Sequence, residues 1–180
     1  MPSLTKAQLD SAQEFATASI AALKTETGIH PGTAIAATAR MAGTYLFRTF
    51  HLQVPGVKPG DVVLSEQANA QGPILIATAA RLLSRMGIQL DPTKAGVPVA
   101  SRDQPTVSFL DSQRLLEPAY LPIRARYGFT DEQAAYAVAA ATSLLINHCK
   151  IGLDIHTAFS IAALGFVEGT KTAPDPIHQP

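Results

Sequence analysis

One stretch of the sequence, residues 131–150, limits the possible folds more than any other. Thr130 and Gln133 stand at its start with the spacing of a capping box, the reciprocal pair that closes the first turn of a helix. Its polar side chains fall mainly along one line, formed by Glu132, Tyr136, Ser143, Asn147 and Lys150, and most of its other residues are Ala, Val, Leu or Ile. A helix that is apolar on most of its sides is buried on most of its sides. We therefore expect a central helix over residues 131–150.

The rest of the chain carries further signals of helices. Alanine dominates several stretches and favours a helix because it loses no side-chain entropy on ordering. The pairs Thr5/Gln8 and Ser108/Asp111 are typical of helix starts, and Gly is typical of the residue after a helix end. The expected helices cover residues 5–28, 33–51, 65–86 with a pause at Gly72-Pro73, 108–117, 131–150 and 155–168, and Pro118 and Pro122 predict a bent connector over 120–129.

Two long connectors separate these helices. Residues 52–64 contain two Pro-Gly dipeptides followed by Val62-Val63-Leu64, so we expect a small β-hairpin or an irregular lobe there. Residues 88–107 read as a loop, and a loop of that length is typically functional or held against a partner. The sequence therefore predicts an all-α, single-domain helical bundle of about five to seven helices over residues 1–169, with Pro/Gly-rich connectors and a flexible C-terminal tail over 170–180.

The low charge of the chain indicates association. Only 16% of its 180 residues are charged, against about 25% in a typical soluble domain. Part of the surface is therefore expected to lie against a partner, and a homo-oligomer, most simply a dimer, is the prediction. The 14 basic residues cancel the 14 acidic ones, which argues against a nucleic-acid partner.

Cysteine usage and hydropathy bound the location. Cys149 is the single cysteine, so neither an intrachain disulfide nor a cysteine-based zinc cluster can form. No secretory signal is recognisable after Met1, and no run of eighteen apolar residues could cross a membrane. We expect a cytoplasmic protein with no membrane partner.

Arginines form the first candidate site. Arg40, Arg48 and His51 follow one stripe of the second expected helix, Arg81 and Arg85 lie four apart on the third, and no acidic residue occurs between Thr27 and Gly60. Two such stripes on apolar helices predict a cleft that binds a carboxylate or a phosphate, with the ligand-binding set Arg40, Arg48, His51, Arg81 and Arg85. The alternative is that these arginines pair with acids elsewhere, namely Glu66, Asp61, Asp103 or Asp111, or lay their stems along apolar surface.

The second candidate site is the corner between the last two helices. His148, Asp154 and His156 could meet there and hold a metal ion, with Asn147 and Cys149 close by. Their spacing matches no established metal motif, and no cofactor is indicated strongly. In the alternative interpretation, His148 contacts the last carbonyls of its helix, Asp154 caps the next helix and Cys149 is a small apolar residue.

The sequence does not name a specific function. No nucleophile elbow and no phosphate-binding glycine loop is present. The leading hypothesis is a homo-oligomeric binding or interaction module for a small anionic ligand, held in the arginine cleft beneath the 88–107 loop. The alternatives are an enzyme that uses the His148/Asp154/His156 corner, with or without a metal, and a purely structural oligomer.

Overall fold

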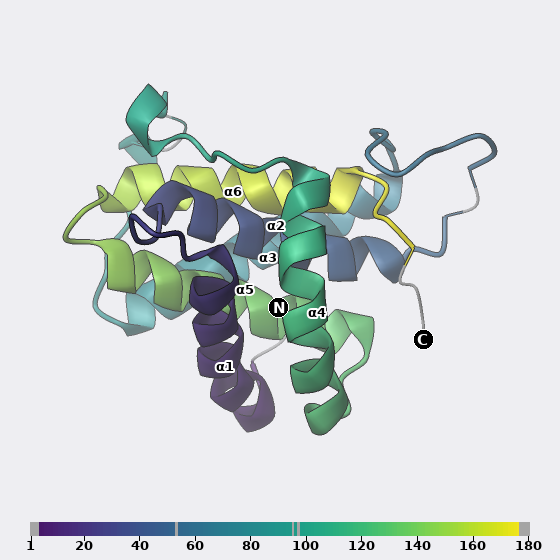
Figure 1. The fold of residues 1–180 in the computed structure, drawn as a ribbon, viewed down its shortest axis with the longest axis horizontal. Helices are drawn as coiled ribbons and strands as arrows, with labels where there is room; N and C mark the ends of the chain where they lie inside the picture. Colours follow the sequence, from purple (N-terminus) through teal and green to yellow (C-terminus); the bar gives the residue numbers. More distant parts are fainter. Residues whose placement is uncertain (1–3, 53, 95, 97, 177–180) are drawn as a thin grey trace.

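The structure is a computed structural model, and it describes residues 4–52, 54–94, 96 and 98–176. Six α-helices and two short 3-10 helices occur in this part of the chain (Figure 1). They are α1 (Lys6–Leu23), α2 (Pro31–Arg48), α3 (Glu66–Arg85), η1 (Pro92–Lys94), η2 (Ser101–Asp103), α4 (Phe109–Tyr127), α5 (Asp131–Cys149) and α6 (Ile155–Lys171). No strand forms among the described residues, so the expectation of an all-α bundle is confirmed.

Helices α2 and α5 form the centre of the bundle. Helix α2 packs on α6, α5 and α4, and α5 packs on α1, α2 and α3. The neighbours α1 and α4 lie side by side and cross the direction of α2 and α6 (Figure 1). Every residue of α5 from Ala134 to Ser143 is buried, which confirms the central position predicted for this helix.

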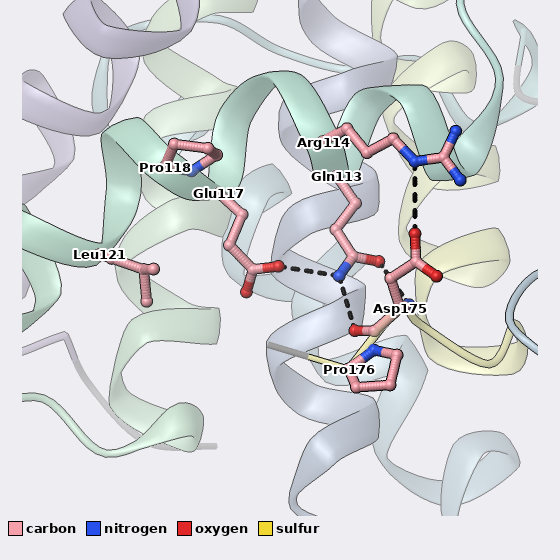
Figure 2. Close-up of a pocket in the computed structure, with 7 residues that line it drawn as sticks. All are labelled: Gln113, Arg114, Glu117, Pro118, Leu121, Asp175 and Pro176. Atoms are coloured by element: carbon pink, nitrogen blue, oxygen red, sulfur yellow. Dashed lines mark hydrogen bonds and ion pairs between the residues drawn. The ribbon is translucent and has the colours of Figure 1, made fainter. Parts of the chain in front are cut away.

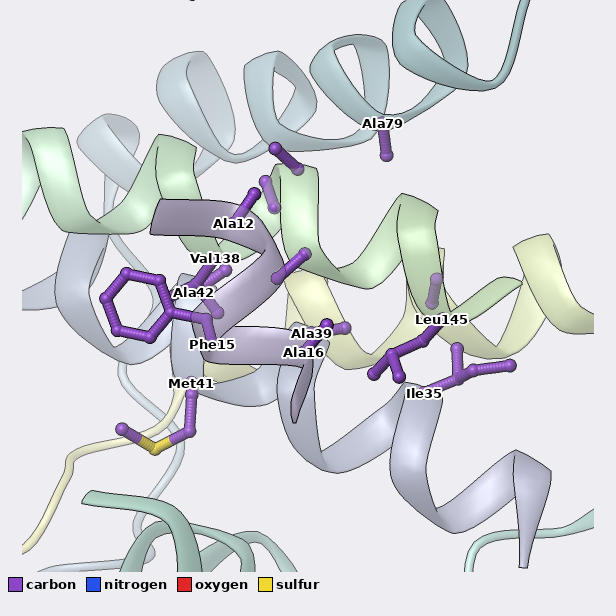
Figure 3. Packing of buried hydrophobic residues seen from close by; sticks show 14 of the residues in the cluster. Ala12, Phe15, Ala16, Ile35, Ala39, Met41, Ala42, Ala79, Val138 and Leu145 are labelled. Carbon is purple, nitrogen blue, oxygen red and sulfur yellow. The ribbon is translucent and has the colours of Figure 1, made fainter. Parts of the chain in front are cut away.

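Small side chains dominate the core. Ala12, Ala16, Ala39 and Ala42 lie in one buried cluster with the larger Phe15 (Figure 3). Alanine faces let helices approach closely. A few large side chains fill the space that remains between the helices. Phe15 and Tyr120 are among these, and their rings meet edge to face with centroids 4.9 Å apart.

The prolines do not end helices where the sequence predicted. Helix α3 runs through Gly72-Pro73 without a pause, and α4 runs through Pro118 and Pro122, so the predicted end at Glu117 and the bent connector are wrong. Both prolines of α4 are exposed, while Leu116, Tyr120 and Ile123 are buried on its packed side. Burial of that side holds the helix together although each proline removes one backbone hydrogen bond.

The first helix also ends earlier than predicted. Helix α1 stops at Leu23, and a turn from Thr25 to Gly28 follows, in which each of these two residues donates its N–H to the carbonyl of the other. Gly28 has φ +110°, a backbone conformation that glycine adopts readily. The glycine at this position therefore belongs to the turn and does not end the helix.

Of the two alternatives expected for residues 52–64, the described residues form the irregular lobe and not the β-hairpin. Among its described residues, Val62 makes only an isolated bridge, and its partner is Thr172. Val63 N–H donates to the carbonyl of Lys171, and Gly60 N–H donates to that of Ala173. The lobe therefore pairs with the chain after α6 instead of with itself, because the two Pro-Gly turns leave each side too short to form its own ladder.

The same contacts hold the segment after α6. Thr172 and Ala173 are buried, and the backbone N–H of Asp175 donates to Gln113 on α4. Residues 172–176, which were expected to belong to a flexible tail, are thus attached to the bundle; residues 177–180 lie outside the described part.

Among the described helices, none combines the length and the hydropathy needed to span a membrane.

Candidate functional site

Arg40 is nearly buried and is held by three acceptors from other elements. Its side chain is 11% exposed, and Nε donates to Oε2 of Glu168 on α6 over 2.7 Å. Nη1 donates to the carbonyl of Val107, 2.7 Å away, and to Oγ of Ser112, 3.1 Å away. Within the described part of the chain, Arg40 therefore donates through Nε and Nη1, and Nη2 is left for a further acceptor.

Arg48 is satisfied by a bidentate pair. Its Nη1 and Nη2 lie 2.5 and 3.2 Å from the two carboxylate oxygens of Glu117 on α4, and Nη2 also reaches the carbonyl of Asp175. The partners named from the sequence for these arginines, Glu66, Asp61, Asp103 and Asp111, are wrong for Arg40 and Arg48. Helices α4 and α6 cover the polar stripe of α2, so their own acids become the partners.

The remaining members of the predicted arginine set lie elsewhere. His51 is exposed just beyond α2, where its φ of +48° places it in the left-handed region, and Arg81 and Arg85 are exposed on α3. Of the five residues in the set, Arg40 alone lines one of the grooves described below. Neither groove is lined by residues of both arginine stripes.

A groove beside Arg40 combines apolar walls with one charged end. It has a volume of about 340 Å³ and lies between the 99–105 segment and α6. Its lining residues are Ala36, Arg40, Val99, Gln104, Pro105, Ile161, Leu164, Gly165 and Glu168. Apolar walls with a few polar groups at one end are the usual composition of a small-molecule site, and this volume lies at the lower end of the usual range.

A larger groove of about 610 Å³ lies between α4 and the segment after α6, and its polar groups are occupied (Figure 2). Gln113 Nε2 donates to Glu117 and to the carbonyl of Asp175, while Gln113 Oε1 accepts the backbone N–H of Asp175. The Asp175 carboxylate pairs with Arg114. These bonds attach the C-terminal segment to α4, which accounts for the polar lining without a ligand.

The predicted metal corner brings only two of its residues together. Asp154 Oδ2 lies 3.8 Å from Nδ1 of His156, and its Oδ1 accepts the backbone N–H groups of His156 and Thr157 at the start of α6. The Thr157 hydrogen bond, first among several causes, lowers the pKa of Asp154. Asp154 is thus a helix cap, as the alternative interpretation of the sequence had it.

The other ring nitrogen of His156 and the remaining residues are engaged differently. Nε2 of His156 accepts the backbone N–H of Asp91, so it carries no proton there and is already occupied. His148 is exposed, and burial raises the pKa of the half-buried Cys149 thiol. Among the described residues, no three His, Cys, Asp or Glu side chains gather to hold a metal ion. The set His148, Asp154 and His156 is therefore not assembled into a metal site.

The sequence did not single out Glu168 or Leu164, which complete the groove beside Arg40. A signal was present, because Glu168 is the single acid of the largely apolar α6, and a charge beside apolar surface needs a partner. Val99 and Gln104 carry no comparable signal, since their position depends on the path of the 88–107 loop.

Comparisons with known proteins give no guide to this site. No protein-family model matches the chain, and neither the curated proteins nor the solved structures searched contain a match.

Proposed function

We propose that the protein is a binding module for a small anionic molecule with an apolar body, held in the groove beside Arg40. One observation carries the proposal: Arg40 lines a groove with apolar walls, and its hydrogen bonds to the described residues use Nε and Nη1 but not Nη2. A carboxylate is the acceptor that matches a guanidinium best, because two parallel hydrogen bonds form between them.

The neighbouring Glu168 permits such a ligand. Its side chain is 38% exposed, whereas that of Arg40 is 11% exposed. Glu168 can therefore turn toward water at little cost, while Arg40 stays in place through Val107 and Ser112. The ligand carboxylate then replaces the carboxylate of Glu168, and the charge of Arg40 remains balanced.

The walls define the rest of the ligand. Val99, Pro105, Ile161 and Leu164 offer apolar surface, and Leu164 is 65% exposed. Covering this surface gains about 25 cal/mol for each Å² removed from water. Short aliphatic carboxylates of about four to eight carbons satisfy both requirements.

The test is a titration of the protein with hexanoate, followed by the backbone amide signals of Gly165 and Leu164, with hexanamide as the neutral control. We expect hexanoate to shift these signals and hexanamide to leave them nearly unchanged. Leu164→Ala is expected to weaken binding at least threefold, because part of one wall is lost. Ile151→Ala is the matched control, since Ile151 is 96% exposed and does not line this groove. Unshifted Gly165 and Leu164 signals at millimolar hexanoate would overturn the proposal.

We also propose that the chain forms a homodimer in the reducing cytoplasm. Four apolar side chains, those of Val54, Val57, Val62 and Leu64, are 36–79% exposed on the lobe between α2 and α3, which projects from the bundle (Figure 1). Exposed apolar clusters of this kind are typical of association surfaces. Light scattering after size exclusion should give twice the chain mass of 19.0 kDa, and Leu64→Glu should return it to one. A monomer in the unchanged protein would contradict the dimer, and Ile151→Glu is the control.

A further inference from the structure

The segment that forms one wall of the Arg40 groove is held by a few polar contacts and by two partly buried valines. We call residues 98–107 the strap; it contains η2 and leads into α4. Val99, Gln104 and Pro105 of the strap line the groove. Val99 and Val107 of the strap pack against the core but are only partly buried, and no residue of the strap is fully buried, so lifting the strap exposes little apolar surface.

Two side chains at the start of α2 hold the strap. Nδ1 of His30 accepts the N–H of Thr33 over 3.1 Å, so the neutral ring carries its proton on Nε2 and donates it to the carbonyl of Arg102, 2.8 Å away. Oγ1 of Thr33 accepts the N–H of Thr106 over 2.9 Å. We call His30 and Thr33 the latch.

A glycine in the same turn of α2 lets the strap lie flat on the helix. A Cβ placed on Gly32 would come 2.0 Å from the carbonyl oxygen of Asp103, which is backbone of the strap. No such contact is tolerated, so a side chain at residue 32 must push the strap away from α2. Gly32 itself does not line the groove.

The strap also ends on the ligand-binding arginine. The carbonyl of Val107 accepts Nη1 of Arg40, so movement of the strap removes an acceptor from Arg40 while it removes a wall from the groove. We propose that the strap is a movable cover of the Arg40 groove, and that the His30 and Thr33 latch controls how often the groove opens. This inference rests on the function proposed above, and it names the regulation of the same site.

A measurement without any ligand tests the cover. Ala36 lines the groove and is 2% exposed, so a cysteine placed there, in a Cys149→Ser background, reacts with iodoacetamide only when the groove opens. We expect Gly32→Ala to raise the rate of modification of the Ala36→Cys protein about tenfold. Ile151→Cys, at a position that is 96% exposed, should react at the same rate with and without Gly32→Ala.

A second variant covers the case in which Gly32→Ala unfolds the protein. Thr33→Val keeps the shape of the side chain and removes the acceptor of the Thr106 N–H. We expect the Thr106 amide to exchange with solvent about tenfold faster, in line with the loss of one hydrogen bond, and Ala36→Cys to react faster by a similar factor. Thr17→Val, on the exposed side of α1, is the control.

The two proposals fail in different ways. If the modification rate of Ala36→Cys is unchanged by both Gly32→Ala and Thr33→Val, the strap is not a cover, whatever binds in the groove. If the rate rises but hexanoate shifts no groove signal in the unchanged protein, the cover stands and the proposed ligand class is wrong. If both hold, hexanoate should dissociate at least threefold faster from Thr33→Val, and an unchanged dissociation rate would show that the strap does not control access.

Discussion

A Cβ placed on Gly43 would lie 2.7 Å from the Cα of Gly169, so the backbones of α2 and α6 touch where these two glycines face each other. Arg40 lies one turn before Gly43, and Glu168 lies next to Gly169. The distance between the two helices therefore sets the 2.7 Å contact between Arg40 and Glu168. Packing and site geometry depend on the same pair of glycines.

Gly169→Ala should strongly destabilise the fold. The added Cβ would lie 2.2 Å from the carbonyl oxygen of Arg40, so the helices must separate. We expect a loss of about 3 kcal/mol in the free energy of unfolding, measured with urea, because overpacking typically costs 1–3 kcal/mol and this contact is with backbone. Gly152→Ala is the matched control, since its nearest neighbour is 4.0 Å away, and it should change stability by less than about 1 kcal/mol. Equal effects of the two changes would contradict this account of the α2–α6 contact.

Two buried tyrosines should respond in opposite directions to the loss of their hydroxyl groups. The Tyr120 hydroxyl lies 2.5 Å from Oγ of Ser19, and burial raises its pKa to about 12. The Tyr45 hydroxyl is buried without a hydrogen-bond partner among the described residues, and burial raises its pKa further. Thermal unfolding should show Tyr120→Phe less stable by about 1 kcal/mol and Tyr45→Phe more stable by about 1 kcal/mol. A destabilised Tyr45→Phe would mean that its hydroxyl is satisfied.

The Arg48–Glu117 pair should behave as a buried ion pair. Its side chains are 13% and 10% exposed, so Glu117→Gln leaves a nearly buried guanidinium without its counter-charge. We expect a loss of about 3 kcal/mol in urea unfolding, and recovery of most of it in the double variant Arg48→Met/Glu117→Leu. Lys6→Ala is the control: it breaks the Lys6–Asp10 pair, in which the Lys6 side chain is 88% exposed, and should cost less than about 1 kcal/mol. A double variant as unstable as Glu117→Gln would argue against this interpretation.

Asp154 should make stability depend on pH in the acid range. Its pKa is lowered in the folded protein, first by the Thr157 backbone hydrogen bond, so its contribution is present above the ordinary value near 3.8 and is lost as the pH falls through the lowered value. Asp154→Ala should cost about 1 kcal/mol at pH 7, whereas Asp154→Asn keeps an acceptor at every pH. The difference in urea stability between the unchanged protein and Asp154→Asn should therefore shrink below pH 4. A difference that stays constant down to pH 2 would show that the Asp154 carboxylate does not act as the cap.

Local signals in the sequence predicted the helices well and the breaks poorly. The capping boxes at Thr5 and Thr130 both form, because they depend only on residues three apart. The prolines of α4 led to a wrong prediction of a helix end, because burial of one helix face stabilises α4 by more than the loss of single backbone hydrogen bonds destabilises it. Residues 52–64 form the irregular lobe and not the hairpin for a related reason: Val62 and Val63 bond to the chain after α6, which no local pattern reveals.

The candidate site was predicted in part. Arg40 was singled out because the second expected helix has arginines and no acids, and in the structure it lines a groove together with Val99, Gln104 and Pro105. The grouping with Arg81 and Arg85 failed, because the orientation of α3 relative to α2 depends on tertiary packing. The carboxylate partners of Arg40 and Arg48 lie 128 and 69 residues away in sequence, beyond the reach of any periodicity.

The most direct test of the proposed function follows the side-chain Nε–H signal of Arg40 during addition of hexanoate. This donor now bonds to Glu168, and a ligand carboxylate that takes the place of Glu168 must change its environment. We predict that the Arg40 Nε–H signal shifts and saturates with hexanoate, and that it stays in place with hexanamide. A stationary Arg40 signal at saturating hexanoate, or an equal shift with hexanamide, would contradict the assignment of Arg40 as the anion-binding residue.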